Sequence, residues 1–184
     1  QCLGEIGVVV KYHTAVADDL EVNVSVFGQA LHRAEIIVVT GGLGPTADDL
    51  TRQALAQATD RPLRQDDGAL EHIQQLFVRR NRPMPQRNVV QALFPDGSSV
   101  IPNPNGTAPG IDLTFQHGDN SSSRVFALPG VPAEMHEMWK QTVAPAICDM
   151  TGDHRQSIVH RRIKCFGRGE SDIEQMMPDM IRRG

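Results

Sequence analysis

The chain has 184 residues, 40% of them hydrophobic, so it can bury the core of one domain and begin another. Its formal net charge is −4 without a run of Lys or Arg, which argues against nucleic-acid binding as the main task. No apolar run reaches membrane-spanning length, and no signal peptide is visible. The cysteines Cys2, Cys148 and Cys165 fit neither a disulfide framework nor a zinc site and predict a reducing cytoplasm.

The first elements predict a β–α–β unit. Residues 7–13, GVVVKYH, form a β-branched run typical of a strand. Residues 18–33 follow as a helix with Asp18 and Asp19 as N-capping residues. Apolar side chains recur along it at helical spacing, namely Leu20, Val24, Phe27 and Leu31. Residues 36–40 suit a strand buried on both faces, so the unit implies a parallel sheet with ligands at the carboxyl ends of its strands.

A glycine turn follows the second predicted strand, in the stretch TGGLGPTADDLTRQA. Its glycines, which turn the backbone where side chains would obstruct it, are Gly41, Gly42 and Gly44. Thr46 stands three residues before Asp49, which is a capping-box-like start for a helix running to about residue 58. Free backbone N–H groups at such a point suit an anion, most often a phosphate.

The middle of the chain predicts another helix and a second irregular loop. Residues 66–81 place Leu70, Ile73, Leu76 and Phe77 on one helical face. Residues 86–93 are either a short helix or an ordered loop, in which Arg87 is an anion contact or a plain surface arginine. Residues 99–101 read as a short strand, and PNPNGTAPG at 102–110 forbids regular structure. This loop offers short polar side chains beside exposed backbone, namely Asn103, Asn105 and Thr107.

The last part predicts a hairpin, a helix and the start of another module. Residues 110–115 and 124–128 pair across a polar turn, and the turn PGVP at 129–132 starts a helix with Pro132 at its first position. One face of that helix carries Met135, Met138, Trp139 and Thr142, which is more typical of core or of a subunit contact than of a ligand site. A strand over 156–166 and a helix over 170–181 follow.

Two domains are expected from this organisation. Residues 1–151 form the first, and residues 152–184 begin a small α+β second module. The chain opens in mid-pattern without Met and ends directly after a helix-like segment, so we expect a fragment of a longer protein.

The glycine turn excludes one kind of phosphate loop and favours another chemistry. Pro45 and Thr46 stand where a Walker A loop needs its lysine, so ATP hydrolysis by that route is rejected. The spacing Gly42-x-Gly44-x-x-Ala47 matches the loose dinucleotide fingerprint, but the acidic ribose ligand is missing. Two carboxylates beside a phosphate loop, Asp48 and Asp49, make better sense with a divalent cation between them and the phosphate. The alternative is that they only stabilise the positive end of the helix dipole.

Four motifs in register carry a family resemblance: TGGLGPTADDLTRQA, PQRNVVQALFP, PNPNGTAPG and FALPGVPAEM. The chain resembles the N-terminal domain of the CinA family (competence/damage-inducible protein), which is similar to the molybdopterin-binding fold of MogA, MoaB, MoeA and gephyrin. The resemblance implies a three-layer α/β/α sandwich with a mostly parallel sheet, in a cytoplasmic homo-oligomer, a dimer or trimer. It also implies that the chain lacks the family's first strand and loop.

The resemblance also implies a function, which we carry as hypotheses. CinA-type domains are associated with metal-dependent hydrolysis of ADP-ribose to AMP and ribose 5-phosphate. Asp48 and Asp49 would then hold Mg²⁺, Mn²⁺ or Co²⁺ and be catalytic, with Asp49→Ala inactive but as stable as the wild type. The expected phosphate contacts are Gly41, Gly42, Gly44, Thr46, Asn103, Gly106, Thr107 and Gly130.

A second hypothesis is a binding module that holds a molybdopterin or a nucleotide without chemistry. A third is a regulatory or assembly domain with Met135 and Trp139 in an oligomer contact. No nucleic acid and no membrane is expected as a partner.

Overall fold

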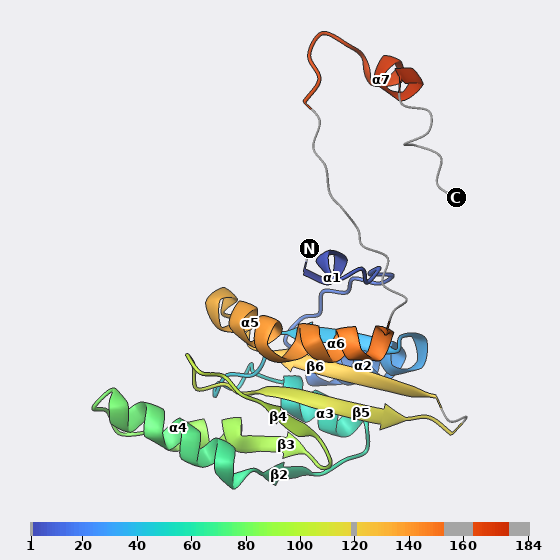
Figure 1. Ribbon diagram of the computed structural model, residues 1–184. Coiled ribbons are helices and arrows are strands. Elements are labelled where there is room, and N and C mark those ends of the chain that lie inside the picture. Colours follow the sequence, from blue (N-terminus) through green and yellow to red (C-terminus); the bar gives the residue numbers. More distant parts are fainter. Residues whose placement is uncertain (1, 119–120, 153–163, 177–184) are drawn as a thin grey trace.

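A four-stranded sheet lies between two layers of helices (Figure 1), in a computed structural model that describes residues 2–118, 121–152 and 164–176. The strand order is β1–β6–β5–β4. The strands are β1 (Ile36–Thr40), β4 (Ser99–Ile101), β5 (Gly110–Gln116) and β6 (Ser122–Leu128). β1 and β6 pair parallel, whereas β6–β5 and β5–β4 pair antiparallel. The predicted α/β class is confirmed, and the described sheet is mixed because short connections join β4, β5 and β6.

Helices cover both faces of this sheet and enclose two separate apolar clusters. The first cluster lies under α2 (Leu20–Arg33), α3 (Thr51–Ala58) and α4 (Asp67–Arg79). The second lies under a continuous helical run made of α5 (Pro132–Met138), the π-helical turn η2 (Trp139–Val143) and α6 (Ala144–Thr151). In Figure 1, α5 and α6 lie on one side of the sheet and α3 on the other.

The strands serve both clusters because successive side chains point to opposite faces. In β6, Val125 and Ala127 belong to the first cluster, whereas Phe126 and Leu128 belong to the second. β1 divides in the same way, with its second and fourth residues against the first cluster and its first and third against the second. The predicted two-sided strand over residues 36–40 is therefore confirmed, although its side chains are only half-buried.

The segment predicted as a strand at residues 7–13 is not one, and the predicted β–α–β unit is wrong. It follows a single helical turn, α1 (Cys2–Glu5), and bonds back to it through Val8 N–H and Leu3 O at 2.9 Å. Val9, Val10 and Tyr12 are exposed. A β-branched run becomes a strand only where another strand pairs with it, and among the described strands β1 pairs with β6 alone.

The helix after the glycine turn starts later than predicted. α3 begins at Thr51, and its N-cap residue Leu50 makes no side-chain capping bond. Thr46 and Asp49 do bond to each other, as a capping box would, but they close a turn ahead of the helix. The short Thr and Asp side chains satisfy local backbone groups, which here competes with helix formation.

Other elements match the prediction closely. Asp19 caps α2 by accepting from Val22 N–H at 3.0 Å, and Asp66 caps α4 by accepting from Ala69 N–H at 2.7 Å. The ambiguous stretch at 86–93 is a 3₁₀ helix, η1 (Gln86–Ala92). The sequence analysis missed β2 (Leu63–Gln65) and β3 (Leu93–Pro95), an antiparallel pair of three-residue strands too short to give a period.

The remaining predictions concern the helix face and the end of the chain. Met138 is buried, and Met135 and Trp139 pack against the second cluster, so the core interpretation of this face is confirmed. The oligomer contact stays a prediction. The predicted strand at 156–166 falls mostly outside the described residues; Lys164, Cys165 and Phe166 are described and form no strand. The last described helix is α7 (Glu170–Met176), and the domain division stays a prediction.

Two further expectations concern cysteines and membranes. The three cysteines are free. In the part of the chain that the structure describes, no helix combines the length and apolarity needed to cross a membrane.

Candidate phosphate site at the carboxyl ends of β1 and β6

Two tight turns lie side by side where the parallel strands β1 and β6 end. Thr40 and Leu128 are opposite each other in the register, so both strands finish at the same level. Gly41 N–H, in the first turn, donates to Leu128 O at 2.9 Å. A Cβ placed on Gly130, in the second turn, would lie 3.5 Å from the Cα of Gly41. The sheet thus brings together two of the three turns that the sequence singled out.

The first turn needs glycine for its conformation and for its close approach to α3. Gly41 and Gly42 have φ angles of +95° and +67°, which L side chains rarely adopt. A Cβ on Gly42 would collide with Thr51 Oγ1. Thr51 Oγ1 donates to Gly41 O at 2.9 Å, and Thr51 N–H donates to Gly42 O at 3.1 Å. The start of α3 is therefore held directly against the turn.

Asp49 is bound into this turn. One carboxylate oxygen accepts from Gly44 N–H at 2.7 Å. The other accepts from Thr46 N–H at 2.9 Å and from Thr46 Oγ1 at 2.6 Å. Burial raises the pKa of Asp49, but these hydrogen bonds and the charge of Arg52 outweigh it and hold that pKa below its ordinary value of 3.8. Two of the predicted phosphate contacts, Gly44 and Thr46, thus direct their N–H groups at the protein's own carboxylate.

Asp48 differs from its neighbour. It is exposed, and the structure gives its side chain no hydrogen bond or ion pair within the described residues. A carboxylate in that state can reach a cation or a water near the turn without breaking an internal contact. The two acidic residues that the sequence treated as a pair therefore have separate environments.

Arg52 stabilises the glycine turn by hydrogen bonds from its buried side chain, a role that the sequence analysis missed. Its side chain is only 4% exposed, and its guanidinium donates to Leu43 O and, at 3.2 Å, to Gly44 O. Among the residues that the structure describes, its Nε finds no hydrogen-bond partner. Burial lowers the pKa of Arg52 to about 10, although Asp49 raises it, so the group is a buried cation at neutral pH. The i, i+3 spacing of Asp49 and Arg52 was the available signal.

A second buried polar group from η1 meets the same carbonyl. Gln91 is 1% exposed and donates to Leu43 O at 3.4 Å, and Asn88 Nδ2 donates to Gln91 Oε1 at 2.8 Å. The glycine turn is therefore fixed from two elements, α3 and η1, that are distant in the sequence.

The loop PNPNGTAPG is organised around Asn103, which is fully buried. Its Oδ1 accepts from Asn105 N–H at 3.1 Å and from Gly106 N–H at 2.8 Å. Its Nδ2 donates to Ala108 O at 2.9 Å and to Glu134 Oε2 at 2.7 Å. The side chain of Asn103 is thus fully used within the protein, and it shapes the loop.

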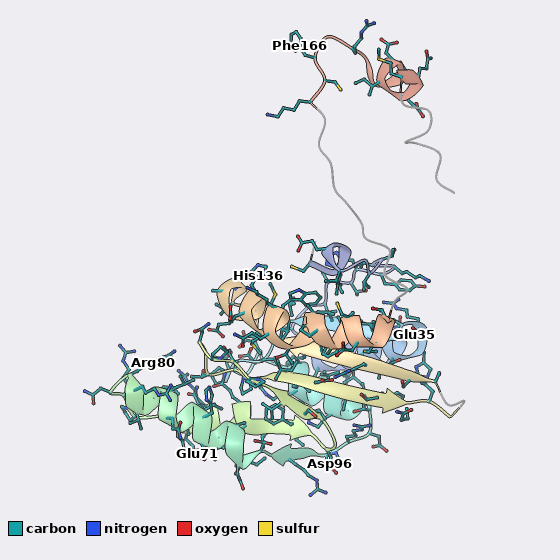
Figure 2. The ribbon with its side chains drawn as sticks, in the orientation of Figure 1. Glu35, Glu71, Arg80, Asp96, His136 and Phe166 are labelled. Carbon is teal, nitrogen blue, oxygen red and sulfur yellow. The ribbon has the colours of Figure 1, made fainter. Side chains whose placement is uncertain are left out.

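Glu134 ties this loop to the first turn of α5. A Cβ on Gly106 would collide with the Glu134 carboxylate, so a larger residue there would displace that carboxylate from its present position. Glu134 is four residues after Gly130, and α5 thereby links the turn at the end of β6 to the loop. The sequence analysis passed over Glu134. His136, two residues further along α5, is exposed (Figure 2).

Helix α4 contacts the other side of the same loop. A ring nitrogen of His72 lies 3.0 Å from Asn103 O, and Arg80 Nη2 donates to Asn105 O at 3.1 Å. Figure 2 shows Arg80 at the carboxyl end of α4.

Metal binding would depend on few protein ligands. Within residues 2–118, 121–152 and 164–176, no group of three or more His, Cys, Asp or Glu side chains is placed to hold a metal ion. Magnesium often takes only one or two carboxylates together with substrate phosphates and water, so a single free carboxylate is compatible with such an ion. Asp48 meets that requirement, whereas the oxygens of Asp49 already accept hydrogen bonds. Thr107, another predicted phosphate contact, is half-buried in the PNPNGTAPG loop.

Comparisons with known proteins agree with this architecture. The family model of the probable molybdopterin binding domain matches residues 1–149. A CinA-like protein of Nostoc punctiforme is 38% identical over 182 residues, which cover 99% of this chain and 42% of that protein. A CinA-like protein of Gloeothece citriformis is 39% identical over 179 residues, 97% of this chain and 42% of that protein. The chain thus spans less than half the length of these curated relatives.

A solved structure is similar over most of its own length. The crystal structure of CinA from Thermoplasma acidophilum, described as a protein of unknown function, matches with a TM-score of 0.65 and 33% identity. The match covers 76% of this chain and 78% of that one. The chain therefore belongs to the family of the probable molybdopterin binding domain and, within it, to the CinA-like proteins.

Proposed function

We propose that this domain binds a phosphorylated small molecule where the turns after β1 and β6 meet, and that it hydrolyses a nucleoside diphosphate sugar there, with ADP-ribose as the substrate to test. The observation that carries the proposal is the contact of Gly41 with Leu128 and Gly130, which puts two glycine turns at the carboxyl ends of parallel strands. Ligands of open α/β sheets bind in such places.

The proposed roles follow from the environments of the side chains. Glycines at the turns let an anion approach the backbone closely, because no Cβ stands in the way. The glycine turn after β1 is stabilised by hydrogen bonds with Asp49, Arg52 and Gln91. The PNPNGTAPG loop is stabilised by Asn103 and Glu134. Asp48 is the carboxylate left free to act at the ligand.

A divalent cation suits the proposed reaction, and Asp48 would hold it. When bound, such a cation neutralises phosphate charge and polarises the phosphorus–oxygen bond. The chain's own part is to orient the phosphates on the turns and to offer one carboxylate beside them.

The alternative is a module that holds a molybdopterin or a nucleotide without turnover. The family description favours it, since the matching model is that of a probable molybdopterin binding domain. The same turns would serve such a ligand, and turnover distinguishes the two functions.

The test is product analysis of the purified 184-residue chain with ADP-ribose and Mg²⁺, Mn²⁺ or Co²⁺. We expect AMP and ribose 5-phosphate from the wild type, and a loss of at least about 100-fold in kcat for Asp48→Ala at an unchanged thermal midpoint. Asp149→Ala is the matched control, because Asp149 is an exposed acid in α6. It lies toward the amino end of β1, away from the turns, since its neighbours Met150 and Thr151 line a hollow with Glu35 and Ile36.

Each outcome has a definite meaning. Absence of AMP with every metal, together with stoichiometric binding of ADP-ribose or a pterin phosphate, would replace the hydrolase by the binding module. Full activity of Asp48→Ala would show that Asp48 has no role in the reaction. Asp49→Ala is a poor probe, because the hydrogen bonds of Asp49 make a loss of stability expected as well.

A further inference from the structure

We propose that residues 79–87 form a cationic rim that captures the anionic ligand of the candidate site; this inference rests on the proposed function. The segment reads RRNRPMPQR and carries Arg79, Arg80, Arg82 and Arg87. No Asp or Glu occurs between Glu71 and Asp96, in a protein whose net charge is −4. The rim thus concentrates positive charge in one short segment, which runs from the last residue of α4 through the connection into the start of η1.

Both ends of the connection are fastened to the candidate site. At the first end, Arg80 donates to Asn105 O in the PNPNGTAPG loop at 3.1 Å. At the second end, Gln91 of η1 donates to Leu43 O in the glycine turn at 3.4 Å. Along the chain, the rim therefore lies between two contacts with the loops that the proposed function places around the ligand.

The chain reverses direction sharply at the end of α4. α4 ends in a Schellman motif, in which Asn81 has a φ of +51° and donates from N–H to Val78 O at 2.9 Å. Arg82 N–H donates to Phe77 O at 3.0 Å in the same motif. Pro83 and Pro85 then exclude a helix until η1 begins, so Arg80 and Arg82 lie on a reversed, stiff connection that leads to Arg87 in η1.

In the described structure, three arginines of the rim are free to bind an anionic ligand. Arg79, Arg82 and Arg87 are exposed, and within the described residues their side chains make no hydrogen bond or ion pair. The ion pairs of the described residues join other partners, Arg64 with Asp96 and Arg124 with Asp112. Guanidinium groups without acidic partners are suited to phosphate, which they can bind in a bidentate manner.

The C-terminal helix dipole explains only part of this pattern. Cations in the last turn of α4 would stabilise its negative end, which accounts for Arg79 and Arg80. Arg87 lies beyond two prolines, outside α4 and at the start of η1, where the effect of the α4 dipole has faded. Substitution of Arg87 therefore distinguishes capture of the ligand from stabilisation of α4.

The experiment is calorimetric titration of the full chain with ADP-ribose and, in parallel, with inorganic pyrophosphate, at about 20 mM and about 300 mM salt. The variant is Arg82→Gln/Arg87→Gln, which leaves the Arg80 contact intact. The matched control is Lys11→Gln/Arg33→Gln, which removes the same charge near the amino end of β1. Arg33 ends α2, with its guanidinium 4.3 Å from the ring of Tyr12. β1 then separates it from the turns by about 15 Å, and Figure 2 shows Glu35 and Arg80 on opposite sides of the domain.

We expect Arg82→Gln/Arg87→Gln to bind both anions about fivefold more weakly than the wild type at low salt, and nearly equally at high salt, because exposed charges are screened. The control should bind as the wild type does at each salt concentration. Arg87→Gln alone should weaken binding without lowering the thermal midpoint.

Other outcomes overturn the inference in distinguishable ways. Equal affinities of the wild type and Arg82→Gln/Arg87→Gln at low salt would refute the rim and leave the proposed function standing. An equal loss in the control would mean that only net charge matters, and it too would refute the rim. No binding of either anion by the wild type would overturn both proposals.

Discussion

Asp48 and Asp49 show how much two adjacent, identical side chains can differ. Asp49 accepts three hydrogen bonds from Gly44 and Thr46, whereas Asp48 is exposed and makes none within the described residues. The sequence indicated that at least one of them has a role near a phosphate, with stabilisation of the positive end of the helix dipole as the alternative. The structure separates a positioning carboxylate from a free one, which depends on the conformation of residues 44–49.

The pKa of Asp49 leads to a stability prediction. Its folded-state pKa lies below the ordinary 3.8, so its stabilising effect is complete well above 3.8 and is lost as the pH falls through the folded-state value. We expect Asp49→Asn to lose about 2 kcal/mol of unfolding free energy at pH 7, because hydrogen bonds to the charged group disappear. Its thermal midpoint should also fall less than that of the wild type between pH 5 and pH 3.

Asp48→Asn provides the control for this measurement. Its thermal midpoint should follow the wild-type curve at every pH, since Asp48 holds no internal contact in the described structure. A wild-type curve parallel to that of Asp49→Asn down to pH 3 would contradict the assigned hydrogen bonds.

The elements around the site are joined by buried polar side chains. Asn103 fixes its own loop and contacts Glu134 on α5. His72 of α4 and Arg80, the residue that follows α4, contact the backbone of the same loop. The sequence correctly predicted irregular structure at PNPNGTAPG and proposed Asn103 as a ligand contact. The contact itself is untested, and full burial gives the amide a structural task instead.

Asn103→Asp tests the link between loop and helix. The substitution would put a second carboxylate at the 2.7 Å contact with Glu134. Two carboxyl groups at that distance repel each other when both are charged, so one of them tends to hold a proton that the pair shares. We expect the variant to be destabilised at pH 7 by about 3 kcal/mol and to regain stability as the pH falls toward 5, because protonation relieves the repulsion.

Chemical unfolding of wild type and variant between pH 5 and pH 8 gives the measurement. Asn105→Asp is the matched control, as its side chain is exposed in the same loop. A destabilisation of Asn103→Asp that does not change with pH would show that Glu134 is not its neighbour.

Two apolar clusters, one on each side of the sheet, stabilise the described domain. Ile73 belongs to the first and Ile147 to the second, and both are fully buried. We expect Ile73→Val and Ile147→Val each to cost about 1 kcal/mol, since each removes one methyl group from a packed site. Because the two sites share no partners, the double variant should lose the sum within about 0.5 kcal/mol.

Urea unfolding of the wild type, the two single variants and the double variant measures these losses of unfolding free energy. A coupling energy above about 1 kcal/mol would show that the two clusters form a single cooperative core across the sheet.

The sequence by itself determined the features that arise from local periodicity and turn chemistry. It placed α2, α4, β1, the β5–β6 hairpin and the start of α5 at Pro132, because these depend on residues within one or two turns or on alternation along one strand. Its motifs also indicated the family, which the comparisons confirm.

The tertiary structure alone decided what depends on distant partners. Residues 7–13 have the composition of a strand but pair with no described neighbour, and β2 and β3 exist only because they pair with each other. Arg52, Gln91 and Glu134 gained their roles from carbonyl and amide groups that the fold brings to them. Hydrogen-bond partners of this kind are fixed by packing, and no local pattern in the chain specifies them.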